Sequence, residues 1–333
     1  MKAMVIEKYG EHVPLLLKER PMPVVGDYDV LVNIRAASLN PIDSKIKAGK
    51  LKFLLHYEMP LILGNDFSGV VVEVGDKVEQ FKPGDEVYGR PRKSRIGTLA
   101  EYIAVHQDDI SLKPTNLSFE EAASIPLVGL TAYQALHDIF NLQKEQKILI
   151  HAGSGGVGTF AIQLAKSMGA YVATTVSDQG YGLVKLLGAD QIINYRKDPF
   201  EQLLEGYDAV LDTLGGDVLK KSFQILKPGG KIVSVSGLPN AQFGKEAGLG
   251  WLKTMLLSIV SRKLTALEKK TQVSYRFLFM KPSGAQLREV RELLEKRRII
   301  PVIDQVFAFA EAPQALAYLD RGRAKGKVVV SIK

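Results

Sequence analysis

The chain has 333 residues, of which 46% are apolar and 24% charged, and it contains no cysteine. These fractions are typical of globular proteins and exclude disordered and fibrous classes, while the length suggests two domains. The lack of cysteine excludes disulfide bonds, thiolate zinc sites, iron–sulfur clusters and a thiol nucleophile, and it is what a reducing compartment permits.

The net charge is +8, from 44 Lys and Arg against 36 Asp and Glu. The basic residues lie in short, scattered clusters without a nucleic-acid-binding motif, so we interpret them as solvated surface and expect no nucleic-acid partner. A modest positive field also suits an anionic small substrate or cofactor. No stretch of about 18 apolar residues occurs and no signal peptide precedes the first strand, so we expect a cytoplasmic protein without a transmembrane segment.

The first 125 residues contain short runs rich in Val, Ile, Ala and Tyr, separated by Gly, Pro, Asn and Asp in turn-forming positions. The predicted strands cover residues 2–6, 29–36, 69–74, 85–88 and 100–105. Their fairly regular spacing predicts an antiparallel, barrel-like β domain.

The pattern changes at residue 126. Residues 127–140 have the apolar spacing of a helix, after which strands and helices alternate. The predicted strands are 147–151, 171–176, 191–194, 208–212 and 231–236, and the predicted helices are 158–168, 182–187, 199–205 and 217–226. Such alternation predicts parallel strands joined by crossover helices, in a doubly wound sheet.

The segment 240–272 is longer than the connections before it and carries a broad helical stripe of apolar residues, beginning at Trp251. We interpret the stripe as an amphipathic helix packed on the body or at a subunit contact. A lid or a membrane-surface helix is the alternative. A sixth strand is predicted at 275–280 and a helix at 284–298, after which residues 302–332 return to the first domain.

The turn after the predicted strand 147–151 fits G-x-G-x-x-G in the strand–turn–helix context that the motif requires. It consists of Gly153, Ser154, Gly155, Gly156, Val157 and Gly158. The first glycine permits the tight turn, the second lets a pyrophosphate approach the backbone, and the third lets helix and strand pack closely. The helix N-terminus offers N–H groups to phosphates. The turn is therefore the predicted phosphate site of a dinucleotide.

The residue that ends the second strand of such a sheet distinguishes the two nicotinamide cofactors. A carboxylate there holds the 2′-hydroxyl of NAD, whereas here Ser177 stands 19 residues beyond Gly158. Serine donates to a 2′-phosphate without repelling it. Tyr195 and Arg196, just past the third strand, add a phenol and a cation, while Asp178 is the argument for NAD. We predict NADPH as the cofactor.

Further motifs extend along the whole chain. They are ASLNPID (37–43), GNDFSG (64–69), PGDEV (83–87), GLTAY (129–133), LLGAD (186–190) and GKVV (326–329), with Gln163 and Lys166 in the helix after the glycine turn. With them the chain resembles the zinc-independent members of the medium-chain dehydrogenase/reductase superfamily, in the quinone oxidoreductase-like group. The resemblance implies a GroES-like, β-barrel-type substrate domain over 1–125 and 300–333, a Rossmann NADP(H)-binding domain over 126–299, and a homodimer.

Zinc-dependent members of that superfamily carry a cysteine where Asn40 stands and His-Glu where Asn65 and Asp66 stand. The five histidines also lack metal-ligand spacing, so we expect no metal site. The resemblance then implies hydride transfer from NADPH to a quinone or an α,β-unsaturated carbonyl, because these acceptors delocalise charge and need no strong Lewis acid.

The resemblance also implies positions around the nicotinamide. Thr131 would lie at the nicotinamide ribose, and Ser236, Gly237 and Phe279 would line the nicotinamide slot from the ends of the fifth and sixth strands. Thr131 is equally plausible as a cap in a helix N-terminal turn.

Asn40 and Tyr57 are the candidate catalytic residues. Asn40 would face the nicotinamide or the substrate oxygen, but a turn-forming role before a proline is an equal alternative. Tyr57 would donate a proton to the developing enolate, although a core or rim tyrosine is more common. We interpret Asp43 as a local cap rather than an acid, and His151 as a buried histidine with satisfied hydrogen bonds.

Two other functions are compatible with the sequence. An NADPH-binding regulatory protein without physiological turnover would have the same fold. A peripheral membrane protein would use residues 251–270 as its anchor.

Overall fold

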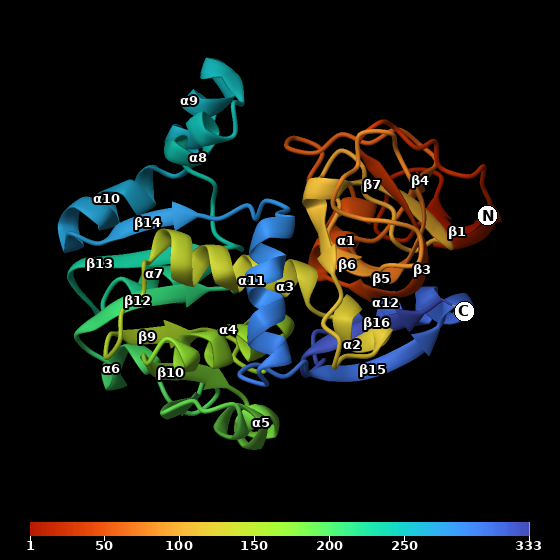
Figure 1. Cartoon of the computed structure of the whole chain (residues 1–333). Helices are drawn as coiled ribbons and strands as arrows, with labels where there is room; N and C mark the ends of the chain where they lie inside the picture. Colours follow the sequence, from red (N-terminus) through yellow and green to blue (C-terminus); the bar gives the residue numbers. More distant parts are fainter. Residues whose placement is uncertain (333) are drawn as a thin grey trace. The chain divides into compact units, whose positions relative to one another are not determined.

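The computed structural model describes residues 1–332, which form two compact units (Figure 1). Unit 1 comprises Met1–Leu130 and Lys281–Lys333, and unit 2 comprises Thr131–Met280. The second boundary therefore lies before the helix α11 (Gly284–Glu295), whereas the sequence analysis set it at residues 299 and 300.

The helix α11 belongs to unit 1 because it is packed closely against that unit's strands. The Tyr88 hydroxyl donates a hydrogen bond to the Leu287 carbonyl oxygen at 2.7 Å. A Cβ on Gly284 would lie 2.1 Å from the Ile110 carbonyl oxygen, so the start of the helix touches the backbone of a neighbouring strand.

Unit 1 is predominantly antiparallel, as its strand pattern predicts. Its strands are β1 (Lys2–Ile6), β2 (Leu16–Glu19), β3 (Asp29–Leu39), β4 (Leu61–Ile62), β5 (Asp66–Val74), β6 (Glu86–Gly89), β7 (Tyr102–His106), β8 (Ile110–Leu112), β15 (Ile303–Ala308) and β16 (Lys327–Ser331). They form a three-stranded sheet in the order β2-β1-β4 and a seven-stranded sheet in the order β15-β16-β3-β5-β6-β8, with β7 also paired to β3. Among the described residues of unit 1, only β15 and β16 pair in parallel.

The long strand β3 brings polar residues from distant parts of the sequence to the candidate catalytic residue Asn40. Its end pairs with the start of β5, where Ser38 lies opposite Asp66. Asn40 follows β3 directly and precedes the helix α1 (Pro41–Lys47). The strand β16 pairs with the same end of β3 and begins at Lys327. Residues that are far apart in the sequence therefore meet where these three strands start or end.

Unit 2 contains a six-stranded parallel sheet in the order β11-β10-β9-β12-β13-β14, which confirms the predicted doubly wound topology. Its strands are β9 (Lys147–Ile150), β10 (Tyr171–Val176), β11 (Gln191–Asn194), β12 (Tyr207–Asp212), β13 (Leu226–Ser234) and β14 (Ser274–Phe277). A buried core that includes Leu149, Ala173, Val210, Ile232 and Tyr275 lies against the sheet.

Helices complete both units. Unit 1 also contains α2 (Phe119–Ala123), α12 (Ala312–Asp320), η1 (Gln107–Asp109) and η4 (Phe309–Glu311), and α3 (Pro126–Tyr133) crosses the first boundary and continues in unit 2 as the π-helical stretch η2 (Gln134–Ile139). Between the strands of unit 2 lie α4 (Gly156–Ser167), η3 (Asp178–Gly180), α5 (Tyr181–Leu186), α6 (Phe200–Leu203) and α7 (Gly216–Ser222).

The segment 240–272 forms three short helices, α8 (Ala241–Glu246), α9 (Gly250–Val260) and α10 (Arg262–Thr271). In Figure 1, α9 stands away from the sheet of unit 2, whereas α10 lies along β14 and α8 also contacts that strand through Phe243. Leu257 is the buried residue of α9, so the apolar stripe of this helix does not pack on the body, while its predicted alternative place at a subunit contact stays a prediction. No helix within residues 1–332 has the length and apolarity needed to cross a membrane.

Candidate active site

The glycine turn joins β9 to α4. Ala152 takes a left-handed φ of 51°, and Gly155 is the N-cap residue of α4 with an extended backbone. The first N–H groups of a helix have no partner within it. Residues 154–157 are partly exposed, so these N–H groups are accessible to an anion.

The three motif glycines have two different surroundings. A Cβ on the buried Gly153 would lie 2.0 Å from Thr174 Oγ1, and a Cβ on the buried Gly158 would lie 2.4 Å from the Ala152 carbonyl oxygen. The Cβ of a residue at Gly155 would touch only the Ala152 carbonyl oxygen, at 3.3 Å. Two glycines are thus required for packing, while the third leaves room for a phosphate to approach.

Three predicted cofactor residues lie at one end of the sheet, after β10 and β11. These strands run in parallel with Val176 opposite Asn194, so their carboxyl ends are adjacent. Ser177 follows β10, and the exposed Tyr195 and Arg196 follow β11. The Arg196 guanidinium lies 5.8 Å from the centroid of the Tyr195 ring.

Asp178, the residue that argues for NAD, is already engaged by neighbours. Its Oδ1 accepts hydrogen bonds from Asn194 Nδ2 at 2.6 Å and from Lys197 Nζ at 3.1 Å. Lys197 is not among the predicted site residues, although it directly follows Arg196. The ion pair is exposed and adds little to stability, but it balances this carboxylate with a cation.

The loop after β13 is held by a buried serine and aspartate. The N–H groups of Ser236 and Gly237 donate to Ser234 Oγ at 3.2 and 2.7 Å, and Ser234 donates in turn to the buried Asp212. A Cβ on Gly237 would lie 2.4 Å from the Tyr275 hydroxyl oxygen. The loop is therefore fixed in place at the carboxyl end of the sheet.

Phe279 and Thr131 come from different kinds of element. Phe279 follows β14, with its ring centroid 6.3 Å from that of Phe243. β14 is the neighbour of β13, so Ser236, Gly237 and Phe279 follow adjacent parallel strands. Thr131 is buried in α3, at the start of unit 2.

His151 is a structural residue, as predicted. Its ring is fully buried, with Nδ1 3.1 Å from Thr175 Oγ1 and Nε2 2.9 Å from Ser222 Oγ. Burial lowers the pKa of His151 to about 4, opposed by the charge of Asp212. The imidazole is therefore neutral near pH 7.

Unit 1 contains a second group of buried polar residues, which we call the polar cluster. It consists of Ser38, Asn40, Asp43, Asn65, Asp66 and Lys327. Asp66 Oδ2 accepts from Ser38 Oγ at 2.9 Å and from Asn40 Nδ2 at 2.8 Å. Asp43 accepts from the Asn40 N–H and from Asn65 Nδ2, both at 2.7 Å. Asp43 is thus a local cap, as predicted, while the Asn40 side chain joins Asp66.

Lys327 supplies the cation of the polar cluster. Its Nζ donates to the Leu39 carbonyl oxygen at 3.1 Å, to Asp66 Oδ2 at 3.2 Å, and to Asn40 Oδ1. This role of Lys327 was not predicted from the sequence, because Lys327 and Asp66 are 261 positions apart. The only sequence feature at this position is the GKVV motif, which contributes to the family resemblance but does not predict a contact between Lys327 and Asp66.

The polar cluster contains buried ionisable groups. Burial raises the pKa of Asp43 to about 6, reinforced by Asp66 and opposed by its hydrogen bonds and by Lys327. Burial also lowers the pKa of Lys327, opposed by Asp66. The Asp66–Lys327 pair is therefore a buried ion pair, in which loss of either partner leaves an uncompensated charge.

The polar cluster does not fit a zinc ion. Zinc sites in proteins use cysteine, histidine and carboxylate ligands. Here the amides of Asn40 and Asn65 take the places of ligands, and the Lys327 ammonium would repel a dication. Within residues 1–332 no three His, Asp or Glu residues are arranged to hold a metal ion.

Tyr57 presents a hydroxyl that has no hydrogen-bond partner in the described part of the chain. The Tyr9 hydroxyl accepts from the Tyr57 N–H at 2.9 Å and donates to the Tyr57 carbonyl oxygen at 3.1 Å, which fixes its backbone. Among the described residues, the buried atoms Tyr57 Oη, Asn65 Oδ1 and Arg90 Nε have no hydrogen-bond partner. Buried polar atoms without partners are rare and point to a water or ligand.

The environment of Tyr57 keeps its hydroxyl protonated. Burial raises the pKa of Tyr57 to about 12, the charge of Arg90 opposes the shift, and that of Asp43 reinforces it. Tyr57 therefore lies within electrostatic reach of the polar cluster and is a hydrogen-bond donor at neutral pH.

Two protein-family patterns match the chain. The alcohol dehydrogenase GroES-like domain matches residues 26–115, and the zinc-binding dehydrogenase family matches residues 187–330. Together with the parallel sheet of unit 2, they confirm the predicted combination of a GroES-like domain and a Rossmann domain.

Similar proteins cover the chain from end to end. The mitochondrial NAD(P)H oxidoreductase RTN4IP1 of Danio rerio is 38% identical over 100% of this chain and 91% of that protein. The 2-methylene-furan-3-one reductase of Solanum lycopersicum is 36% identical over 99% of this chain and 79% of that protein. The solved quinone oxidoreductase of Coxiella burnetii has a TM-score of 0.85 at 34% identity, over 100% and 99% of the two chains. The Escherichia coli quinone oxidoreductase complexed with NADPH has a TM-score of 0.85 at 25% identity, over 100% of both chains. The chain therefore belongs to the medium-chain dehydrogenase/reductase superfamily, in its quinone oxidoreductase group.

Proposed function

We propose that the protein is a zinc-independent reductase that transfers a hydride from NADPH to a quinone or an α,β-unsaturated carbonyl compound. The observation that carries this proposal is the Lys327 ammonium bound to Asn40 and Asp66 inside the polar cluster. The residues of this cluster do not fit a metal ion that would polarise a plain aldehyde or alcohol. Quinones and enones accept hydride without one, because the negative charge spreads onto their oxygen.

When bound, NADPH supplies the hydride, and the protein supplies binding, orientation and a polarised pocket. Tyr57 donates a hydrogen bond to the substrate oxygen, since its hydroxyl is protonated and has no partner among the described residues. Asn40 Nδ2 donates one hydrogen to Asp66, which leaves the second to face the nicotinamide or the substrate oxygen. Lys327 and Asp66 are positioning residues that fix this amide.

The preference for NADPH over NADH belongs to the same proposal. Ser177 and Arg196 offer a hydroxyl and a guanidinium to a 2′-phosphate, and a guanidinium is the side chain best suited to that group. Tyr195 lies beside Arg196. Asp178, which would hold the 2′-hydroxyl of NAD, is instead paired with Lys197. The glycine turn, Gly153 to Gly158, receives the pyrophosphate, and Thr131, Ser236, Gly237 and Phe279 surround the nicotinamide.

We also propose a homodimer in the cytoplasm. β14 is the edge strand of the sheet of unit 2, where pairing with a second copy would occur. The Tyr275 N–H and C=O are already bonded to Glu268 and Asn240, so this pairing would use other residues of the edge. The absence of cysteine suits a reducing compartment. Light scattering of the purified protein and fractionation of the source cells test these two statements separately.

Steady-state NADPH oxidation against quinones, 2-alkenals and alkenones, with NADH in parallel, tests the proposed function. We expect turnover of at least one of these acceptors, with a higher kcat/KM for NADPH than for NADH. Tight NADPH binding without turnover across all acceptors would instead support a regulatory binding protein. Equal or better turnover with NADH would contradict the cofactor assignment.

A further inference from the structure

The helix α9 exposes its apolar side chains rather than burying them. Its exposed apolar residues are Trp251, Leu252, Met255, Leu256, Ile259 and Val260. Trp251, the only tryptophan of the chain, is 78% exposed. At 3.6 residues per turn, the six side chains occupy one continuous arc of about 180° around the helix. A scattered set of exposed apolar residues is ordinary, but a continuous helical face of them marks an interaction site.

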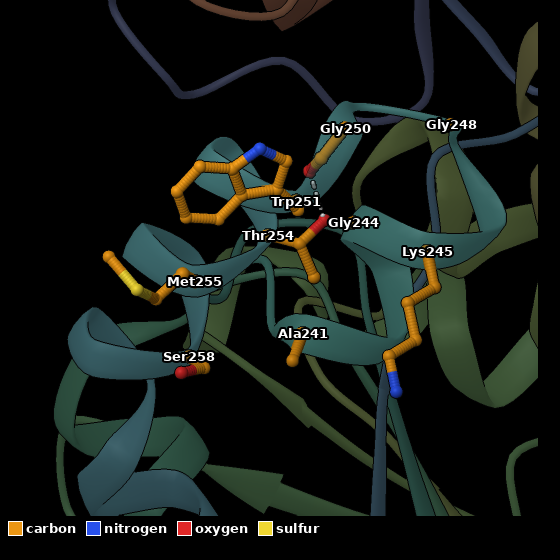
Figure 2. A pocket seen from close by; sticks show the side chains of 9 residues that line it. All are labelled: Ala241, Gly244, Lys245, Gly248, Gly250, Trp251, Thr254, Met255 and Ser258. Carbon is orange, nitrogen blue, oxygen red and sulfur yellow. Dashed lines mark hydrogen bonds between the residues drawn. The ribbon is translucent and has the colours of Figure 1, made fainter.

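The inner side of α9 is the more polar one. Thr254 donates a hydrogen bond to the Gly250 carbonyl oxygen at 2.7 Å, and Gly244 of α8 would contact Thr254 if it carried a Cβ. A hollow of about 590 Å³ lies between α8 and α9 and is lined partly by Trp251 and Met255. Figure 2 shows these two side chains extending from α9 on the rim of the hollow. The apolar arc is therefore directed at solvent by the way α9 sits on α8.

The segment that carries this apolar arc has a surplus of positive charge. The segment 240–272 contains the cations Lys245, Lys253, Arg262, Lys263, Lys269 and Lys270 against the carboxylates Glu246 and Glu268. Both carboxylates are engaged within the protein. Glu246 pairs with Arg276, and Glu268 accepts from the Tyr275 N–H at 2.8 Å. The cations of α10 are exposed, so this surface combines apolar side chains with surplus positive charge.

We propose that α9, flanked by the cations of α10, docks the protein on the surface of an anionic phospholipid bilayer. An interfacial helix of this kind inserts its apolar face at the headgroup boundary while Lys and Arg pair with acidic lipids. Tryptophan is enriched at that depth because its ring is apolar and its N–H is polar. Docking would give the enzyme access to acceptors dissolved in the bilayer, and only this purpose rests on the proposed function.

A second copy of the chain fits this surface less well. A two-fold contact with its axis at α9 would place α9 of one copy on α9 of the other. The surplus cations of both copies would then face each other at short range, which is unfavourable. An anionic bilayer instead neutralises them.

The test uses the full chain with vesicles of pure phosphatidylcholine and with vesicles containing phosphatidylglycerol. The single tryptophan reports directly from α9. We expect a blue shift of Trp251 emission and protection from acrylamide with the anionic vesicles, both reduced by high salt. Co-sedimentation of Trp251→Ser and of the double variant Lys269→Gln with Lys270→Gln is expected to fall about tenfold or more.

Leu186→Ser is the matched control, because Leu186 in α5 of the same unit is 79% exposed. It is expected to bind vesicles like the unchanged chain. Turnover of a water-soluble acceptor by Trp251→Ser is expected to be unchanged, so failure of docking and failure of the proposed function are distinguishable. An unshifted Trp251 emission with anionic vesicles would overturn the proposal. So would a shift that follows protein concentration without lipid, which would assign the surface to a second copy.

Discussion

The glycine turn of unit 2 and the polar cluster of unit 1 are built in opposite ways. The turn consists of consecutive residues, 153–158, and presents backbone N–H groups. The polar cluster consists of side chains from positions 38 to 327, and its central ion pair joins residues 261 positions apart. One site depends on the absence of side chains, and the other depends on six of them.

This difference explains how each site responds to change. A site made of backbone is disturbed by any added atom, because Gly153 and Gly158 have no room for a Cβ. A site made of buried charges is disturbed by any lost atom, because Asp66 and Lys327 compensate each other. Substitutions in the turn should therefore act on cofactor binding, and substitutions in the polar cluster on stability and turnover.

The largest expected effect comes from enlarging the turn. In Gly153→Val the new side chain collides with Thr174 Oγ1, which lies 2.0 Å from the position of a Cβ. We expect NADPH affinity to fall on the order of 100-fold or more, because the N–H groups move out of place. Titration of the cofactor by fluorescence measures this. Gly182→Ala is the control, since a Cβ there meets nothing within 4 Å and affinity should be kept.

Removing the cation of the polar cluster should cost stability. In Lys327→Met, Asp66 stays buried without its counter-charge. We expect the free energy of unfolding to fall by about 3–5 kcal/mol, measured by denaturant titration. The exposed Lys82→Met serves as the control and should change little. An unchanged free energy of unfolding in Lys327→Met would show that the Asp66–Lys327 ion pair makes no net contribution to stability.

The buried groups Asp43 and His151 should make contributions to stability that respond to pH in opposite directions. The pKa of Asp43 is raised from 3.8 to about 6, so its stabilising contribution is complete below pH 3.8 and lost as pH rises through 6. The pKa of His151 is lowered from 6.5 to about 4, so its contribution is complete above pH 6.5 and lost as pH falls through 4.

The Asp43→Asn variant isolates the first of these contributions. Between pH 4 and 7, the unchanged chain should lose up to about 3 kcal/mol of stability relative to this variant. Melting temperatures of both proteins across that range measure the difference, and the exposed Asp76→Asn provides the reference. A difference that does not vary with pH would contradict the raised pKa.

A smaller effect is expected at the end of the sheet that faces the 2′-position. Arg196→Ala removes the guanidinium beside Tyr195. We expect the ratio of kcat/KM for NADPH to that for NADH to fall about tenfold, as for loss of one charge-assisted hydrogen bond. The exposed Arg323→Ala should leave the ratio unchanged. A ratio that Arg196→Ala does not alter would remove this residue from cofactor selection.

The contrast between the two sites also explains what could be predicted from the sequence. The alternation of strands and helices gave β10 and β11 with their observed bounds, because parallel buried strands and short turns are local signals. The glycine turn was visible for the same reason. Strand β3 was predicted to end at residue 36 but continues to Leu39, because its pairing with β5 and β16 extends it.

The features that could not be predicted from the sequence are those that depend on contacts between residues far apart in the chain. Lys327 belongs to the polar cluster only because β16 pairs with β3, and no local sequence pattern predicts that pairing. Arg90 and the partnerless Tyr57 hydroxyl become notable only when burial is known. The apolar residues of α9 were visible as a stripe, but their exposure follows from how α9 sits on α8 and could not be predicted from spacing.

The most direct test of the central claim is kcat/KM of Tyr57→Phe together with its NADPH dissociation constant. Because the Tyr57 hydroxyl has no partner among the described residues, its removal breaks no hydrogen bond within the protein. We predict that kcat/KM with the best quinone or enone falls about tenfold while the NADPH dissociation constant changes less than about twofold. The exposed Tyr28→Phe should change neither value. Unchanged kcat/KM in Tyr57→Phe, or an equal loss of NADPH binding, would contradict the account.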